Sequence, residues 1–375
     1  MERERDSEKR GTRDAESAFV IAGGGTGGHL FPGIAVAREL EKRFERPEII
    51  FVVGRRKMET EILSRYGYRA KCIDVEGMKG RGLKQGIAVL AKLPKSMMQS
   101  VSVIKEFSPL LVLGMGSYSA GPVCLAAKFM RIPTAIHEQN SYPGLTNRLL
   151  AKIVDRVFIS FEESRAHFKT SALFLTGSPV REEFIPDQSR GRIEREKFTI
   201  LVVGGSQGAR AINRAFAEAL VYLKSRGRDP EVIHQTGTVD YDQVVEDYRE
   251  KDLKGELMPF IQDMTAAYNR ADLVVSRAGA LTIFELAALG KPSVLIPYPY
   301  AANRHQEINA RSLVRAGAAE TIHQRDLTGE GLSLVLMKYM DDRFVLEEMG
   351  RRARKIGRPD AAKVIVDKLL ELIKL

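Results

Sequence analysis

The chain has few of the cysteines that cross-link small secreted folds, and it lacks the long apolar runs that cross a membrane. Its 375 residues include two cysteines, Cys72 and Cys124, which stand in different segments. This number disfavours a disulfide framework and a cysteine-based metal site, and we expect both thiols to be buried. No apolar run approaches the ~20 residues that a transmembrane helix needs. Residues 1–18 lack the apolar stretch of a secretory signal, so we expect a disordered, charged tail there.

Acidic residues with the spacing of metal ligands are also scarce. The one Asp-x-Asp pair is Asp240 and Asp242, at the start of a polar, helix-like stretch over 241–250 rather than at a strand end. We interpret this pair as part of a solvated helix face. We therefore expect neither a metal ion nor any other cofactor.

The charge balance favours an anionic partner. The formal net charge is +10, which attracts nucleic acid, acidic lipid or phosphorylated substrates. Residues 77–105 carry six basic and no acidic residues, with apolar residues between them. This mixture predicts contact with an anionic membrane surface rather than with nucleic acid, whose grooves usually add aromatic residues. A core helix with a solvated basic face is the alternative. The predicted membrane-contact residues are Lys79, Arg81, Leu83, Lys84 and Ile87.

One kind of glycine-rich turn occurs twice, about half the chain apart. GGGTGGH over 23–29 and GGSQGAR over 204–210 each follow an apolar run and precede a helical pattern. A buried strand, a glycine turn and a helix N-terminus together offer backbone N–H groups to an anion. Two copies predict paired α/β domains that face each other across a cleft, and this arrangement suits an enzyme with two phosphate-bearing substrates.

Alternating short apolar strands and helical stretches predict an open parallel sheet in each half, with a linker over 179–197. The expected strands lie at 19–22, 49–53, 71–75, 110–113, 134–137 and 156–159, and then at 200–203, 231–235, 273–276 and 293–297.

Further polar motifs follow the predicted strands, where ligands bind in open parallel sheets. They are GMGSYSAGP over 114–122, HEQN over 137–140, SRAGALTIFE over 276–285 and PYPYAANRHQ over 297–306. The helix that opens near Ala280 offers N–H groups to a diphosphate, and the Glu285 carboxylate can accept hydrogen bonds from both hydroxyls of a ribose. His29, beside the first glycine turn, is a candidate proton acceptor.

These motifs, in this order from about residue 19 to beyond residue 306, resemble the MurG family of glycosyltransferases. The resemblance implies the α/β GT-B fold, in which two Rossmann-like domains face each other across a cleft. It implies four segments: the tail 1–18, an acceptor and membrane-facing domain 19–180, a donor domain 181–358, and a C-terminal helix 359–375 that returns to the first domain.

The resemblance also implies an activity. This is the transfer of GlcNAc from UDP-GlcNAc to the 4-hydroxyl of MurNAc on undecaprenyl-pyrophosphoryl-MurNAc-pentapeptide (lipid I), giving lipid II with inversion. It implies a peripheral enzyme on the cytoplasmic face of the bacterial plasma membrane, with other cell-wall and division proteins as further candidate partners.

The resemblance assigns site residues by motif. The donor site would comprise Thr26, Gly27, Gly28, Asn140, Arg181, Ser206, Ile261, Ala280, Leu281, Thr282, Ile283, Phe284, Glu285 and Gln306. The acceptor side would comprise Gly25, His29, Ser117, Tyr118 and His137. In one departure from the family, Ser117 stands where many relatives have a second glycine.

Three alternatives stay open at this point. Another glycolipid glycosyltransferase of the same fold would differ only in its acceptor. An NADP-dependent oxidoreductase would use Arg55 and Arg56 for the 2′-phosphate, but it would leave the second glycine turn and 276–285 without a role. The catalytic base is His29 or, alternatively, Glu138.

Overall fold

The computed structural model describes residues 17–25, 27–75, 83–185, 197–205 and 208–373; within 83–92 it describes the backbone only. The described chain divides into two compact units. Unit 1 comprises the chain up to Arg181 together with the segment from Pro359 to the C-terminus, and unit 2 comprises Glu182–Arg358. Predicted tail residues 1–16 lie outside the description, whereas Ala18 is already part of the first strand.

Unit 1 is built on a seven-stranded parallel sheet of order β3-β2-β1-β4-β5-β6-β7. Its strands are β1 (Ala18–Ala22), β2 (Glu48–Val53), β3 (Arg69–Cys72), β4 (Leu111–Gly114), β5 (Thr134–Glu138), β6 (Arg156–Ile159) and β7 (Leu173–Leu175). Its helices are α2 (Gly27–Glu41), α3 (Lys57–Arg65), α4 (Leu83–Phe107), α5 (Ser117–Phe129), α6 (Leu145–Leu150) and α14 (Ala361–Leu370), with the 3-10 turn η1 (Glu162–His167).

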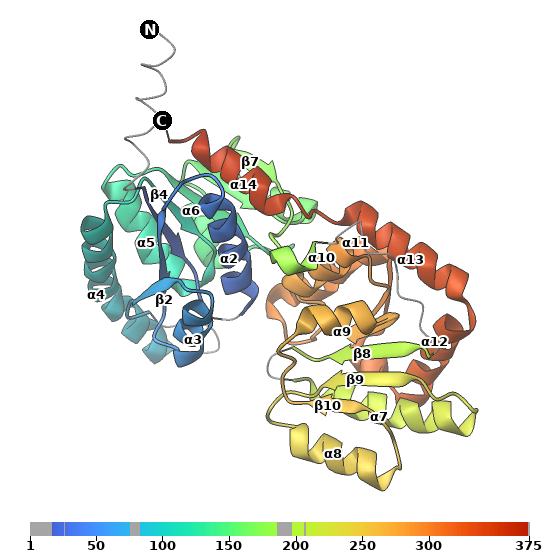
Figure 1. Cartoon of the computed structure of the whole chain (residues 1–375). Coiled ribbons are helices and arrows are strands. Elements are labelled where there is room, and N and C mark those ends of the chain that lie inside the picture. Colours follow the sequence, from blue (N-terminus) through green and yellow to red (C-terminus); the bar gives the residue numbers. More distant parts are fainter. Residues whose placement is uncertain (1–16, 26, 76–82, 186–196, 206–207, 374–375) are drawn as a thin grey trace. The chain divides into compact units, whose positions relative to one another are not determined.

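The central strands of unit 1 are apolar on both faces because helices cover both. Phe19 and Ile21 of β1 join one core with α2, α3 and α14, whereas Val20 and Ala22 join another with α4, α5 and α6. This is the pattern of a buried parallel strand, whose side chains alternate between two covered faces. The helices on either side of the sheet can be followed in Figure 1.

The last helix, α14, completes the core of unit 1. Its Ile365, Val366 and Leu369 are at most 1% exposed and belong to the core that α2 also lines. Ion pairs of 2.8 Å join Asp367 to Arg43, and Glu371 to Arg156. The unit therefore draws part of its core from residues that follow unit 2 in the sequence.

Unit 2 contains a six-stranded parallel sheet of order β10-β9-β8-β11-β12-β13. Its strands are β8 (Thr199–Val203), β9 (Glu231–Gln235), β10 (Glu256–Met258), β11 (Leu273–Ser276), β12 (Ser293–Leu295) and β13 (Ala319–Thr321). Its helices are α7 (Arg210–Ser225), α8 (Tyr241–Glu250), α9 (Met264–Arg270), α10 (Ala280–Leu289), α11 (His305–Arg315), α12 (Gly329–Asp341) and α13 (Arg343–Ile356), with 3-10 turns η2 (Glu182–Phe184), η3 (Ala302–Arg304) and η4 (Gln324–Asp326).

The predicted fold class, paired α/β parallel sheets, is confirmed, but three details differ. The outer strands β7, β10 and β13 were not expected. Cys72 is exposed, because it lies on the edge strand β3, and only Cys124 is buried. Of the Asp240 and Asp242 pair, Asp242 is exposed as expected, whereas Asp240 is 8% exposed and forms a 2.8 Å ion pair with Arg210.

Candidate functional site

The first glycine turn brings the ends of β1 and β4 close together. A Cβ on Gly23 would lie 2.7 Å from the Cβ of Met115, so only glycine permits this approach. Gly25 has φ +96°, a conformation that side chains other than glycine's disfavour. Gly27 and Gly28 begin α2, and predicted site residue Thr26 lies outside the described residues. These glycines therefore set the backbone path at the carboxyl edge of the sheet.

A carboxylate of the protein itself occupies this turn. Glu59 is 1% exposed, and its Oε1 accepts a hydrogen bond from the Gly25 N–H. Its Oε2 is buried without a partner in the described part of the chain, and a Cβ on Gly24 would lie 2.7 Å from it. Arg56 donates to the Gly25 carbonyl at 2.8 Å. The first turn therefore already holds a carboxyl group of the protein where a phosphate was expected.

Ser117 links the first turn to the turn after β4. Its Oγ accepts from the Gly24 N–H at 3.0 Å and lies 3.1 Å from the hydroxyl of Ser119. Its φ is +65°, in the left-handed region that favours glycine. This φ explains why a glycine fits at the position, and the hydrogen bond explains how a serine is accommodated. The next residue, Tyr118, is 41% exposed.

The His29 ring lies where the ends of β1, β4 and β5 meet. Its Nδ1 is 2.9 Å from the Met115 carbonyl oxygen and 3.0 Å from Oε1 of Gln139. Both neighbours accept hydrogen bonds, so Nδ1 carries the proton and Nε2 carries the lone pair. Burial lowers the pKa of His29, against the opposing effect of these hydrogen bonds. The ring is therefore neutral at pH 7 and able to accept a proton at Nε2.

The HEQN segment has an internal structural role that the sequence did not indicate. His137 has no exposed surface, and its Nε2 is 3.0 Å from the Gly177 carbonyl oxygen, so direct contact with an acceptor is closed to it. Glu138 is 2% exposed and accepts hydrogen bonds from the N–H groups of Asn140 at 2.9 Å and Gly144 at 3.1 Å, and from Nδ2 of Asn147 at 2.9 Å.

Burial raises the pKa of Glu138, and the same three donors oppose that rise. A carboxylate with its lone pairs committed to loop N–H groups is a poor proton acceptor for a substrate. The geometry therefore favours His29 over Glu138 as the base, and it makes Glu138 the group that holds the loop carrying Asn140.

Arg181, the last residue of unit 1, packs against α2 and α3. Its guanidinium lies 4.4 Å from the centroid of the Phe31 ring, and Nη1 is 3.4 Å from the hydroxyl of Tyr66. A cation over an aromatic face is held by the ring quadrupole. Phe31 also packs against Gly27, so Arg181 lies beside the start of α2.

The second glycine turn, after β8, is anchored by a residue that sequence reasoning missed. Nε2 of Gln235 donates to the Gly205 carbonyl at 3.0 Å, and its Oε1 accepts from the Ile261 N–H at 3.0 Å. Gly205 has φ +93°, and a Cβ on Gly208 would lie 2.1 Å from the Thr236 carbonyl oxygen. Predicted site residue Ser206 lies outside the described residues. Gln235 is the last residue of the buried strand β9, and this position at a strand end was the only available signal for its role.

The N-terminus of α10 has no side-chain cap. Gly279 occupies the cap position and contributes no side-chain cap, so the first-turn N–H groups lack one of their usual partners. These groups carry the partial positive charge of the helix. The predicted donor residues in this helix are Ala280, Leu281, Thr282, Ile283, Phe284 and Glu285.

Glu285 is 5% exposed, and its Oε2 accepts a hydrogen bond from the Tyr268 hydroxyl at 3.3 Å. The Tyr268 ring packs edge-on against Phe184 at 5.6 Å. Glu285 is therefore fixed by its neighbours rather than being a solvated acid in the first turn of the helix.

A strained loop follows β12. Asn303 and Arg304 are consecutive non-glycine residues with φ +52° and +54°, and both are exposed. Such strain clusters at ligand sites. The next predicted residue, Gln306, accepts from the Tyr298 N–H at 2.9 Å. Arg277 braces the same region by donating to the Ile296 carbonyl at 3.1 Å, while burial lowers its pKa.

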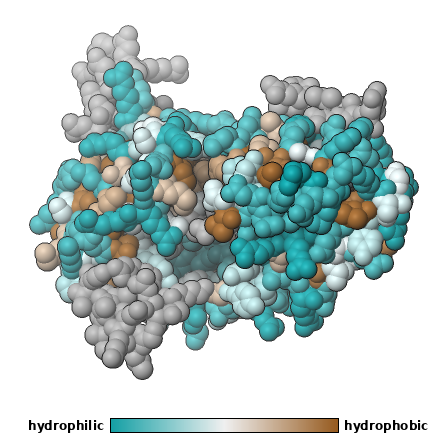
Figure 2. All heavy atoms as spheres, turned by 90° about the horizontal axis from the view of Figure 1, so that it is seen from below, coloured by the Kyte–Doolittle hydropathy of each residue, from teal (hydrophilic) through white to brown (hydrophobic). Residues whose placement is uncertain are grey.

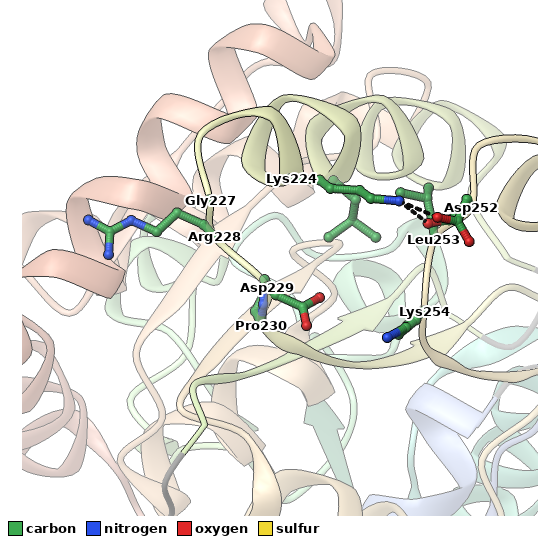
Figure 3. Close-up of a pocket in the computed structure, with 9 residues that line it drawn as sticks. Lys224, Gly227, Arg228, Asp229, Pro230, Asp252, Leu253 and Lys254 are labelled. Carbon is green, nitrogen blue, oxygen red and sulfur yellow. Dashed lines mark hydrogen bonds and ion pairs between the residues drawn. The ribbon is translucent and has the colours of Figure 1, made fainter.

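A shallow pocket lies at the opposite edge of the second sheet (Figure 3), where β9 and β10 begin. Nζ of Lys224 lies 2.6 Å from both the carbonyl oxygen and Oδ2 of Asp252. Lys224 and Asp252 are thus paired with each other, and ligands of parallel sheets bind at the carboxyl ends of strands rather than at this edge. We assign no function to this pocket.

The predicted membrane-contact residues are only partly described. Lys79 and Arg81 lie outside the described residues, and Leu83, Lys84 and Ile87 belong to α4 without described side chains.

Among the described residues, no helix is both long and apolar enough to cross a membrane. In the same part of the chain, no group of acidic, histidine or cysteine side chains could hold a metal ion. Figure 2 shows a face on which hydrophilic residues predominate and apolar residues form small separate patches.

Comparison with known proteins fits this architecture. Residues 19–159 match the glycosyltransferase family 28 N-terminal domain, and residues 199–365 match its C-terminal domain. The fold is shared with UDP-GlcNAc 2-epimerase from Neisseria meningitidis, at a TM-score of 0.66 and 16% identity over 95% of this chain and 100% of that one. The two sheets with their glycine turns are thus those of a two-domain, UDP-sugar-dependent glycosyltransferase.

The relatives narrow the class to one family. The chain is 44% identical to the UDP-N-acetylglucosamine–N-acetylmuramyl-(pentapeptide) pyrophosphoryl-undecaprenol N-acetylglucosamine transferase of Syntrophus aciditrophicus, over 95% of this chain and 99% of that protein. It is 46% identical to the protein of the same name from Geotalea uraniireducens, over 94% and 97%. The crystal structure of Acinetobacter baumannii MurG matches with a TM-score of 0.75 and 32% identity, over 95% and 99%. The chain belongs to the MurG family of N-acetylglucosaminyltransferases.

Proposed function

We propose that this protein transfers GlcNAc from UDP-GlcNAc to the 4-hydroxyl of MurNAc on lipid I, forming lipid II with inversion at the anomeric carbon. The observation that carries the proposal is the neutral His29, whose Nε2 lone pair stands at the carboxyl edge of β1, β4 and β5. Family membership supplies the identity of donor and acceptor. Another glycolipid acceptor finds no support in the relatives' names.

We propose that unit 2 binds the donor. Its glycine turn has no internal carboxylate among the described residues, in contrast to the Glu59-filled turn of unit 1. The uncapped start of α10 suits the diphosphate, and Glu285 suits the ribose hydroxyls. Ile261, next to Gln235, would lie near the uracil, and Gln306, in the first turn of α11 just after the strained loop, would bind the sugar. We retain Thr26, Gly27, Gly28, Asn140, Arg181 and Ser206 as further donor contacts on the strength of the family motif.

The chemistry is a single displacement. Nε2 of His29 takes the proton of the acceptor's 4-hydroxyl as that oxygen bonds to C1 of GlcNAc. The bond from C1 to the diphosphate oxygen breaks, and UDP leaves with the electron pair. N–H groups at the α10 N-terminus stabilise the charge that develops on the leaving diphosphate. Gly25, Ser117 and Tyr118 would line the acceptor side.

Measuring UDP release from UDP-GlcNAc, with and without a water-soluble, short-chain lipid I analogue, tests the activity. Acceptor-dependent release is expected. His29→Ala should lower turnover by ~10²-fold or more with little change in donor affinity, because a general base contributes about that factor. Turnover within a few-fold of the parent would mean that His29 is not the base. Absence of acceptor-dependent release would overturn the proposed function itself.

We propose that unit 1 sits peripherally on the cytoplasmic face of the plasma membrane, where the polyprenyl tail of the acceptor remains. Helices α4, α5 and α6 cover one face of its sheet. They expose apolar side chains that include Met98 (70%), Phe129 (75%) and Leu149 (55%). Contact with other cell-wall and division proteins is part of the same proposal and rests on family membership alone.

Vesicle co-sedimentation tests this surface. Phe129→Ser combined with Met98→Ser should weaken binding to anionic vesicles, while turnover of a water-soluble acceptor stays at the parent level. Phe344→Ser is the matched control, because Phe344 is 77% exposed on α13 of unit 2. Equal vesicle binding by all three proteins would show that this face is not the membrane contact.

A further inference from the structure

A chain of hydrogen bonds runs inward from the proposed base. His29 Nδ1 lies 3.0 Å from Gln139 Oε1, Gln139 Nε2 lies 3.1 Å from His137 Nδ1, and His137 Nε2 lies 3.0 Å from the Gly177 carbonyl oxygen. Gln139 Nε2 also lies 2.8 Å from the Met115 carbonyl oxygen. His137 and Gln139 are at most 2% exposed. The reaction proposed above uses neither of these two side chains.

The order of donors and acceptors in this chain has one consistent solution. The Gly177 carbonyl can only accept, so Nε2 of His137 bears the proton and Nδ1 is an acceptor in the neutral ring. Gln139 must therefore point its amide nitrogen at His137 and at Met115, and its oxygen at His29. That oxygen can only accept, so Nδ1 of His29 bears the proton.

The Met115 carbonyl reinforces the same solution from a second side. It receives hydrogen bonds from Gln139 Nε2 at 2.8 Å and from His29 Nδ1 at 2.9 Å. A flipped Gln139 amide would place two oxygens against each other at this point. Burial lowers the pKa of His137 to about 4, so this ring stays neutral and its acceptor atom stays available at physiological pH.

We infer that Gln139 is a positioning residue that fixes the tautomer and orientation of His29, and that His137 in turn fixes the orientation of Gln139. The wrong tautomer would present an N–H at Nε2, which cannot accept the proton of the acceptor hydroxyl. This inference rests on the proposed role of His29 as the base. It assigns to the buried part of HEQN a task in catalysis that requires no contact with either substrate.

Two substitutions of Gln139 test the inference by kinetics. Gln139→Met keeps the length of the side chain but removes both polar atoms, so kcat should fall ~10-fold or more while the KM for UDP-GlcNAc stays unchanged. Gln139→Glu keeps an acceptor toward His29 and adds a negative charge beside its ring, but its second oxygen faces the Met115 carbonyl and the Nδ1 lone pair of His137, so kcat should stay below that of the parent. An opposite charge at this distance raises a histidine pKa by roughly 1–3 units, so the acid limb of the kcat/KM profile should move to higher pH.

Gln99→Met is the matched control. Gln99 is also partly buried in unit 1, and its amide contacts the backbone N–H of Asp74 at 2.8 Å and the Asp74 carboxylate at 3.2 Å. This variant should lose stability without any change in the pH profile. An unchanged kcat in Gln139→Met would overturn the inference.

A spectroscopic measurement separates this inference from the proposed function. In 15N-histidine-labelled protein, whose six histidines are assigned with the help of His29→Ala, His29 should show a protonated Nδ1 and an unprotonated Nε2. Gln139→Met should shift this pattern toward a mixture of tautomers. A parent spectrum with Nε2 protonated would overturn the inference. The expected tautomer together with full activity of His29→Ala would instead overturn the role of His29 as the base.

Discussion

Replacing Glu138 by glutamine distinguishes a base from a loop anchor at this position. The carboxylate accepts hydrogen bonds from the N–H groups of Asn140 and Gly144 and from Nδ2 of Asn147, all at 2.9–3.1 Å. In Glu138→Gln one of the two oxygens becomes an NH2 group that faces a donor. At least one charge-assisted bond is then lost, and a buried N–H is left unpaired.

The size of the effect follows from these contacts. A hydrogen bond to a charged group contributes ~1.5–3 kcal/mol, and an unpaired buried donor costs ~1–3 kcal/mol, so a loss of ~2–4 kcal/mol is expected after partial relaxation. For a unit of this size, roughly 2–4 °C per kcal/mol corresponds to a decrease in Tm of about 5–15 °C. Turnover measured at low temperature should fall far less than in His29→Ala.

Differential scanning calorimetry and UDP release measure the two quantities separately. Glu162→Gln is the control, since Glu162 is exposed and pairs with Arg165; its loss should cost less than ~1 kcal/mol. A Glu138→Gln protein with the parent's Tm and a 10²-fold lower turnover would refute this reasoning and make Glu138 the base.

Three further predictions concern other parts of the two units. Glu285→Ala should weaken UDP-GlcNAc binding by ~1.5–3 kcal/mol in calorimetry. Tyr268→Phe removes the 3.3 Å hydrogen bond but keeps the carboxylate, so it should bind the donor as the parent does. Equal affinity in all three proteins would rule out Glu285 as a ribose ligand. Burial lowers the pKa of His137 to about 4. As the pH falls from 6.5 to about 4, the unfolded chain binds a proton at His137 that the folded ring does not bind. His137 should therefore lower the free energy of unfolding by about 1.4 kcal/mol for each pH unit of this fall. Urea unfolding at pH 7 and pH 5 should show this loss, and a His137→Phe variant that loses as much stability as the parent would contradict it. Ser117→Ala should lower the free energy of unfolding by ~0.5–1.5 kcal/mol, because the hydrogen bond from the Gly24 N–H is lost. Ser117→Gly loses the same bond but relieves the strain of a φ of +65°, so it should be the more stable of the two variants. The reverse order of stabilities in urea would disprove this explanation.

The sequence predicted the central strands of both sheets because these are apolar and lead into glycine turns. The predicted strand 231–235 coincides with β9, and β1 begins one residue before its predicted start. The outer strands β7, β10 and β13 have three residues each and carry Glu or Thr or lie only partly buried. Short strands of this kind carry no clear periodicity, and the neighbouring strand rather than their own pattern determines them.

The sequence could predict single residues of the candidate site from their types and their places in motifs, but not the contacts between them. His29 could be proposed from its place beside a glycine turn. Its partner Gln139 lies 110 positions away in the chain, and no local pattern indicates that pair. The same holds for Glu59, whose spacing on a helix gave no sign that its carboxylate enters the first turn. Such contacts arise where the ends of different strands meet, so they depend on sheet order rather than on spacing.

The return of α14 to unit 1 has a consequence for the order of folding during synthesis. Unit 2 is contiguous in sequence and can complete its core once Arg358 has left the ribosome. Unit 1 is begun first but lacks Ile365, Val366 and Leu369 until all of unit 2 has been made. Until then the apolar surface of α2 that these side chains cover is open to water and to other chains. The half of the protein that is synthesised first is therefore the half that folds last, and a premature stop shortly before residue 361 would leave a finished second unit attached to an unfinished first one.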